Sequence, residues 1–129
     1  MLRTIYAVVT GYLLIGALVV ITDLIAAAPI PSFHTMPTPP FYYFLISLAT
    51  DSLYSVAGGY VCAAAARANA RNAVLGLIVL GELIGVVSQL ALWNTVPHWF
   101  ALALLAVYPP AVWIGGRLRS GRAVSAATA

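Results

Sequence analysis

The sequence predicts an all-α membrane protein, a single domain of four transmembrane helices in an up-down-up-down bundle. Hydrophobic residues make up 63% of the 129 residues and charged residues 7%, whereas soluble domains average about 45–50% and 25%. Four apolar runs, each roughly 18–26 residues long, are sufficient to cross a hydrocarbon core of about 30 Å. The predicted spans are residues 4–28, 41–66, 73–93 and 99–116.

The basic residues of the chain predict its orientation. All six are arginines, and each lies at the end of an apolar run. They are Arg3, Arg67, Arg71, Arg117, Arg119 and Arg122. Four crossings place all of them on one face, which the positive-inside rule makes cytoplasmic, so both termini are expected inside. We therefore interpret the net charge of +3 as the result of arginines that set the orientation in the membrane and contact anionic lipids. Nucleic acid is not expected as a partner. Arginine without lysine, together with abundant alanine, favours a bacterial source and hence the bacterial inner membrane.

The first connection, residues 29–40, holds five of the eight prolines. Such a segment resists helix formation and favours extended geometry, so a stiff external strap is expected. An aromatic run, 41–44, follows it at the start of the second span, and Trp93 and Trp99 mark the same interface on the last two spans. Aromatic rings of this kind concentrate at headgroup depth.

The other two connections, 67–72 and 94–98, are short. Short links make consecutive helices antiparallel neighbours, which favours the up-down-up-down order. The end of the chain, 118–129, is expected to be a flexible cytoplasmic tail. Consecutive prolines at Pro109 and Pro110 are expected to break or kink the fourth span, because they remove two donors from its hydrogen-bond ladder.

Two acids are predicted at the middle of the membrane. Asp51 lies about ten residues into the second span and Glu82 about nine into the third, so both reach a depth of roughly 15 Å. No basic residue lies at that depth. Ionised acids there are costly, so at least one of the pair is expected to be protonated.

Other polar residues are predicted beside this pair. Tyr54 shares a helical face with Asp51, Gln89 shares one with Glu82, and Tyr108 lies near the midplane on the fourth span. One interpretation is a proton- or cation-binding site formed by Asp51, Glu82, Tyr54, Gln89 and Tyr108. The alternative is that these groups only hydrogen-bond the helices together.

A metal site has weaker support. His34, His98, Asp23 and Met36 all map to the external side, and their side chains are of the kinds that bind copper or zinc. Their spacing fits no metal signature, so neither a metal nor another cofactor is predicted. Cys62 is the single cysteine, which excludes an intramolecular disulfide and a CxxC pair, and it is expected to be a small packing residue.

The sequence alone favours an accessory or scaffold subunit of a larger membrane complex. The expected partners are the lipid bilayer and other membrane subunits or a second copy of the chain. The alternative function is a small proton- or cation-coupled transporter or channel that uses Asp51 and Glu82. An enzyme is the least supported class, because no catalytic motif is present.

Overall fold

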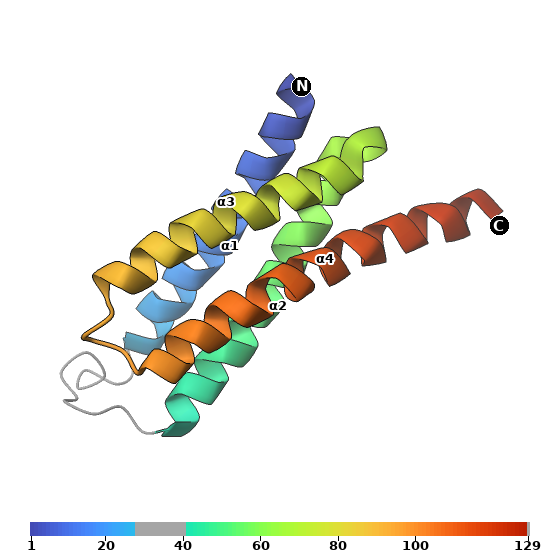
Figure 1. Ribbon diagram of the computed structural model, residues 1–129. Coiled ribbons are helices and arrows are strands. Elements are labelled where there is room, and N and C mark those ends of the chain that lie inside the picture. Colours follow the sequence, from blue (N-terminus) through green and yellow to red (C-terminus); the bar gives the residue numbers. More distant parts are fainter. Residues whose placement is uncertain (28–40, 129) are drawn as a thin grey trace.

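A computed structural model describes residues 1–27 and 41–128, with the side chains of 1–25 and 41–122. Every regular element of these ranges is helical, which confirms the all-α part of the predicted fold class (Figure 1). The elements are α1 (Leu2–Ala27), α2 (Phe41–Ala66), the short 3-10 helix η1 (Arg67–Asn69), α3 (Ala70–Ala91) and α4 (His98–Thr128). The expected strap at 29–40 lies outside the described residues.

Three helical stretches of the described chain are long and apolar enough to cross a membrane. They are Leu2–Ile25, Phe41–Ala91 and His98–Arg122. The second contains α2, η1 and α3, and the chain reverses direction within it, so that α3 runs back alongside α2 (Figure 1). Arg67 opens this turn with a φ of 53°, a left-handed conformation that L-residues rarely adopt.

The two ends of the molecule differ in chemistry. The start of α1, the turn between α2 and α3 and the C-terminal half of α4 lie at one end, the arginine end (Figure 1). Arg3 donates a hydrogen bond across it to the carbonyl oxygen of Ala65, at 3.2 Å. At the opposite end, the aromatic end, Phe41 packs on Trp99 and Phe44 on Phe100, with ring centroids 5.2 Å and 5.0 Å apart.

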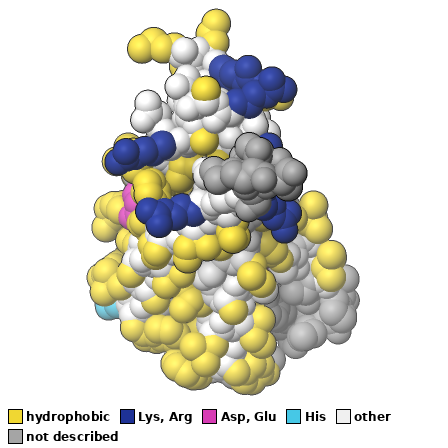
Figure 2. All heavy atoms as spheres, turned by 90° about the vertical axis from the view of Figure 1, so that its right-hand side faces the viewer, with side chains coloured by type: hydrophobic (Ala, Val, Ile, Leu, Met, Phe, Trp, Pro, Cys, Tyr) yellow, Lys and Arg dark blue, Asp and Glu magenta, His cyan; other side chains and the backbone are white. Residues whose placement is uncertain are grey.

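The surface between these ends is apolar. Large side chains such as Leu13, Leu53 and Leu83 are each more than 60% exposed. Figure 2 shows this apolar surface below a group of arginine side chains near the top of the view. The large exposed apolar area is typical of a membrane-spanning protein and not of a soluble domain.

The interior of the arginine end is filled with small and aliphatic side chains. Ala7, Cys62, Leu77 and Val112, one from each of the four long helices, are completely buried. The thiol is free, and Gly11 on α1 lies so close that a Cβ there would stand 2.9 Å from the Cβ of Cys62. This half of the molecule is therefore densely packed and apolar.

Helix α4 departs from two expectations. The prolines at 109 and 110 were expected to break or kink the span; the break is wrong, because α4 continues through both residues, whereas the kink stays a prediction. Each proline costs about 3 kcal/mol inside a helix, and burial of the following Ala111 and Val112 offsets part of that cost.

The segment 118–128, expected to be a flexible tail, is also helical and ends at Thr128. Alanine and arginine are good helix formers. The Arg122 guanidinium, 5.8 Å from the Tyr60 ring centroid, attaches this part of α4 to α2.

Candidate functional site

A cavity of about 150 Å³ lies between all four long helices, and we call it the carboxyl cavity. Its polar lining is Asp51, Ser52, Ser55, Glu82, Gln89 and Tyr108. Apolar side chains of α1 and α4 complete the wall. The two acids thus share one cavity.

Helical spacing and two glycines produce this arrangement. Asp51 and Ser55 are one turn apart on α2, and Glu82 and Gln89 are two turns apart on α3. A Cβ at Gly81 would stand 2.0 Å from the Tyr108 hydroxyl, so the missing side chain makes room for the phenol. The Tyr108 hydroxyl donates a hydrogen bond to the carbonyl oxygen of Leu77, at 3.0 Å.

The hydroxyl hydrogens of the cavity are directed away from the acids. Ser52 donates to the carbonyl oxygen of Leu48 at 2.6 Å, and Ser55 donates to the main-chain carbonyl oxygen of Asp51 at 2.8 Å. The Tyr108 hydroxyl also bonds a main-chain carbonyl. These three groups therefore present only oxygen lone pairs to the cavity.

Two oxygens in this region are buried without a hydrogen-bond partner among the described residues: Glu82 Oε1 and Gln89 Oε1. No arginine or histidine of the described residues lines the cavity. Buried polar atoms without a partner are rare and call for an explanation such as a water or an ion. The cavity is rich in acceptors and poor in donors, so its chemistry suits a proton or a cation bound by oxygen ligands.

A second cavity of about 300 Å³ adjoins the first toward the aromatic end, and we call it the outer cavity. Asp51 and Gln89 line both cavities, while Thr22, Asp23 and Tyr54 line only the outer one. The Thr22 and Tyr54 hydroxyls are hydrogen-bonded to each other and join α1 to α2. The structure therefore places Tyr54 beside Asp51 but outside the carboxyl cavity.

Among the described residues, the space toward the arginine end is filled by the buried cluster around Leu77, Cys62 and Val112. The carboxyl and outer cavities lie on the aromatic-end side of this cluster.

The candidate metal ligands are not assembled in the described residues. His98 is exposed and stacks on Trp93, with ring centroids 4.1 Å apart, whereas Asp23 lines the outer cavity. His34 and Met36 lie outside the described residues. No group of three or more histidine, cysteine, aspartate or glutamate side chains is positioned to hold a metal within the described ranges.

Sequence reasoning did not single out Ser52 and Thr22, which line the two cavities. Ser52 directly follows Asp51 and Thr22 directly precedes Asp23, but neighbouring residues of a helix do not share a face, so helical periodicity marks neither position. Their contribution depends on how α1 and α2 are rotated against each other, which no local pattern specifies.

Comparison of the chain with protein-family models, curated proteins and solved structures gave no match.

Proposed function

We propose that this protein is a small transporter or channel that binds a proton or a small cation between Asp51 and Glu82. The supporting observation is the carboxyl cavity, which both acids line together with the hydroxyl groups of serines. These hydroxyls donate their hydrogens to main-chain carbonyl oxygens, so they can only accept hydrogen bonds from a ligand in the cavity. An ionised acid inside a bilayer costs about 2.5–3.5 kcal/mol or more. Binding of a proton or a cation by the pair would remove much of that cost.

The proposed topology has four crossings with both termini in the cytoplasm, in the bacterial inner membrane. Two features support it. The chain reverses at η1, so α2 and α3 would each cross once. Helix α1 begins at the arginine end and α4 ends there, and the opposite end has neither arginine nor lysine in the described residues. The positive-inside rule would make the arginine end cytoplasmic.

In this proposal, the ligand enters from the aromatic end. It passes Asp23 and the Thr22–Tyr54 pair in the outer cavity and reaches Asp51 and Gln89, which line both cavities. A proton would then be shared between Asp51 and Glu82. A cation would instead be held by their carboxylates and the Gln89 amide oxygen. Release toward the cytoplasm would require the packed arginine end to open.

A liposome assay with the purified protein tests this function. A potassium diffusion potential drives flux, and an enclosed dye reports internal pH or cation concentration. Wild type should show uptake, and Asp51→Asn and Glu82→Gln should abolish it without changing the elution profile in detergent, because an amide can replace a neutral acid in packing. Asp23→Asn removes a carboxyl from the proposed entry route in the outer cavity and should slow flux without abolishing it, because Asp51 and Glu82 remain. Absence of flux in wild type, or full flux in both cavity variants, would refute the proposal.

A second candidate is an accessory or scaffold subunit of a larger membrane complex. The observation that favours it is the buried apolar cluster at the arginine end, which closes the interior there among the described residues. Solubilisation from native membranes in mild detergent tests this role. A stoichiometric membrane partner that persists through purification would support it, and a chain that elutes alone would argue against it.

A further inference from the structure

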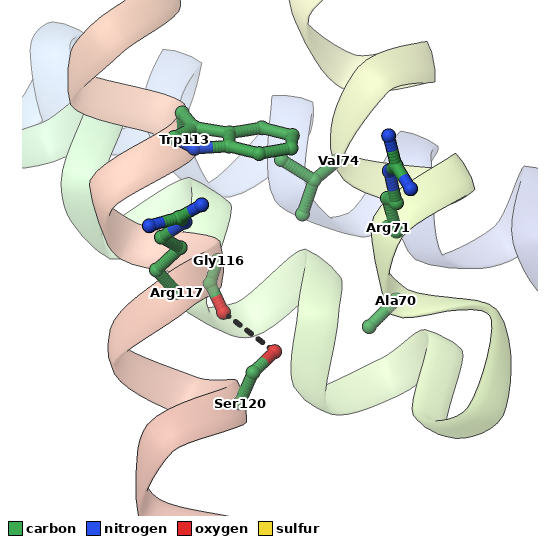
Figure 3. Close-up of a pocket in the computed structure, with 7 residues that line it drawn as sticks. All are labelled: Ala70, Arg71, Val74, Trp113, Gly116, Arg117 and Ser120. Atoms are coloured by element: carbon green, nitrogen blue, oxygen red, sulfur yellow. Dashed lines mark hydrogen bonds between the residues drawn. The ribbon is translucent and has the colours of Figure 1, made fainter.

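We propose that the pocket between α3 and α4 at the arginine end binds the phosphate group of an anionic phospholipid. The pocket has a volume of about 390 Å³ and is lined by Ala70, Arg71, Val74, Trp113, Gly116, Arg117 and Ser120 (Figure 3). We call it the arginine pocket. It is separate from the carboxyl cavity and does not depend on the function proposed above.

No acidic side chain of the described residues lines the pocket. Arg71 on α3 and Arg117 on α4 line it together. The chain has three acidic residues, and all three line the carboxyl and outer cavities instead. A phosphate is the group whose charge and oxygens complement two guanidinium groups.

The neutral residues of the pocket favour a lipid as the source of that phosphate. Figure 3 shows the Trp113 ring reaching from α4 toward Val74 on α3, with Arg117 beside the indole. The Arg117 guanidinium carbon lies 5.6 Å from the Trp113 ring centroid. The pocket thus combines two cations with an apolar wall. A phospholipid has both parts, whereas inorganic phosphate would leave the apolar wall unused.

The shape of the pocket follows from one glycine. A Cβ at Gly116 would stand 2.7 Å from Cγ2 of Val74, so the missing side chain lets α4 approach α3 and form the floor. The Ser120 hydroxyl donates to the Gly116 carbonyl oxygen at 3.1 Å (Figure 3). Its hydrogen is therefore already used, and the side-chain donors that the pocket offers a phosphate are the two guanidinium groups and the Trp113 indole N–H.

Trp113 supplies an intrinsic probe for the test. In the full chain carrying Trp93→Phe and Trp99→Phe, it is the single tryptophan, since the sequence contains three. The protein is reconstituted in phosphatidylcholine vesicles containing either brominated phosphatidylglycerol or brominated phosphatidylcholine at equal mole fraction. We expect stronger quenching of Trp113 by the anionic lipid. Equal quenching by the two lipids would overturn the proposal, and this arm leaves both arginines in place.

Arginine substitutions then locate the effect. Arg71→Gln with Arg117→Gln should reduce quenching by the anionic lipid to the phosphatidylcholine level, since each cation near an anionic surface contributes about a fivefold change in affinity. Arg67→Gln with Arg122→Gln removes the same charge at the same end but outside the pocket, and it should retain most of the preference. Equal loss in the two double variants would mean a diffuse charge effect and no site.

Competition separates the two sources of phosphate. Soluble short-chain phosphatidylglycerol should displace the brominated lipid from detergent-solubilised protein, whereas inorganic phosphate at the same concentration should not. Displacement by inorganic phosphate with equal potency would assign the pocket to a free anion and overturn the lipid proposal.

Discussion

Gly59 on α2 lies directly against the main chain of Val112 on α4. A Cβ at Gly59 would stand 2.2 Å from the Val112 carbonyl oxygen. The contact is reciprocated by Gly115 on α4, where a Cβ would stand 2.0 Å from the carbonyl oxygen of Val56. Backbone atoms cannot move aside as a flexible side chain can, so these two glycines set the distance between α2 and α4.

Gly59→Ala is therefore expected to destabilise the bundle by about 1–3 kcal/mol, since overpacking of a tight contact forces the helices apart. Thermal or denaturant unfolding in detergent, followed by circular dichroism, measures the change. Gly16→Ala is the matched control, because nothing lies within 4 Å of a Cβ there. It should leave stability unchanged or raise it by up to about 1 kcal/mol through helix propensity. An equal loss in both variants would contradict the close approach.

Tyr108→Phe removes the hydrogen bond to the Leu77 carbonyl oxygen that joins α4 to α3. We expect a loss of about 0.5–1.5 kcal/mol in the free energy of unfolding. The measurement is the same unfolding transition, with Tyr60→Phe as control, because no hydrogen bond to its hydroxyl occurs among the described residues and its ring contact with Arg122 is kept. The prediction fails if the two substitutions have the same effect.

The Thr22–Tyr54 hydrogen bond joins α1 to α2 in the wall of the outer cavity. A double-mutant cycle with Thr22→Val and Tyr54→Phe should give a coupling free energy of about 0.5–1.5 kcal/mol, because either single change leaves one hydroxyl without its partner. Additive effects of the two substitutions would show that the hydroxyls are not paired in the membrane.

The proposed topology predicts which sites are labelled from outside the cell. In a Cys62→Ala background, a membrane-impermeant maleimide should label Ser32→Cys in intact cells. It should label Ser120→Cys only after the membrane is permeabilised, because the arginine end is expected in the cytoplasm. Labelling of Ser120→Cys in intact cells would show that the orientation is reversed.

The sequence alone was sufficient for the helical class and for most helix positions. The second apolar run, predicted at 41–66, coincides with α2 (Phe41–Ala66). The predicted connection 67–72 contains the reversal at η1, but α3 begins at Ala70, three residues before the predicted start of the third span. These features are local, because helix formation and partition into a bilayer depend on nearby residues and on the length of an apolar run.

Local rules were insufficient for α4. They predicted a break or kink at Pro109 and Pro110 and a flexible tail over 118–129, yet the helix runs without a break to Thr128. Burial of Val112 and the contact of Arg122 with Tyr60 are interactions with another helix. Such interactions override the local penalty of proline.

Only the tertiary structure decided how the polar residues are grouped. Depth along the helices placed Asp51 and Glu82 at one level, but the rotation and crossing of the helices decided that they line one cavity and that Tyr54 lines the next. The same packing directed the Ser55 hydroxyl and the Tyr108 hydroxyl to main-chain oxygens. Helix rotation is set by many weak contacts between side chains that are distant in sequence, and by backbone approaches such as that of Gly59 to Val112. Periodicity within a single helix carries no information about those contacts.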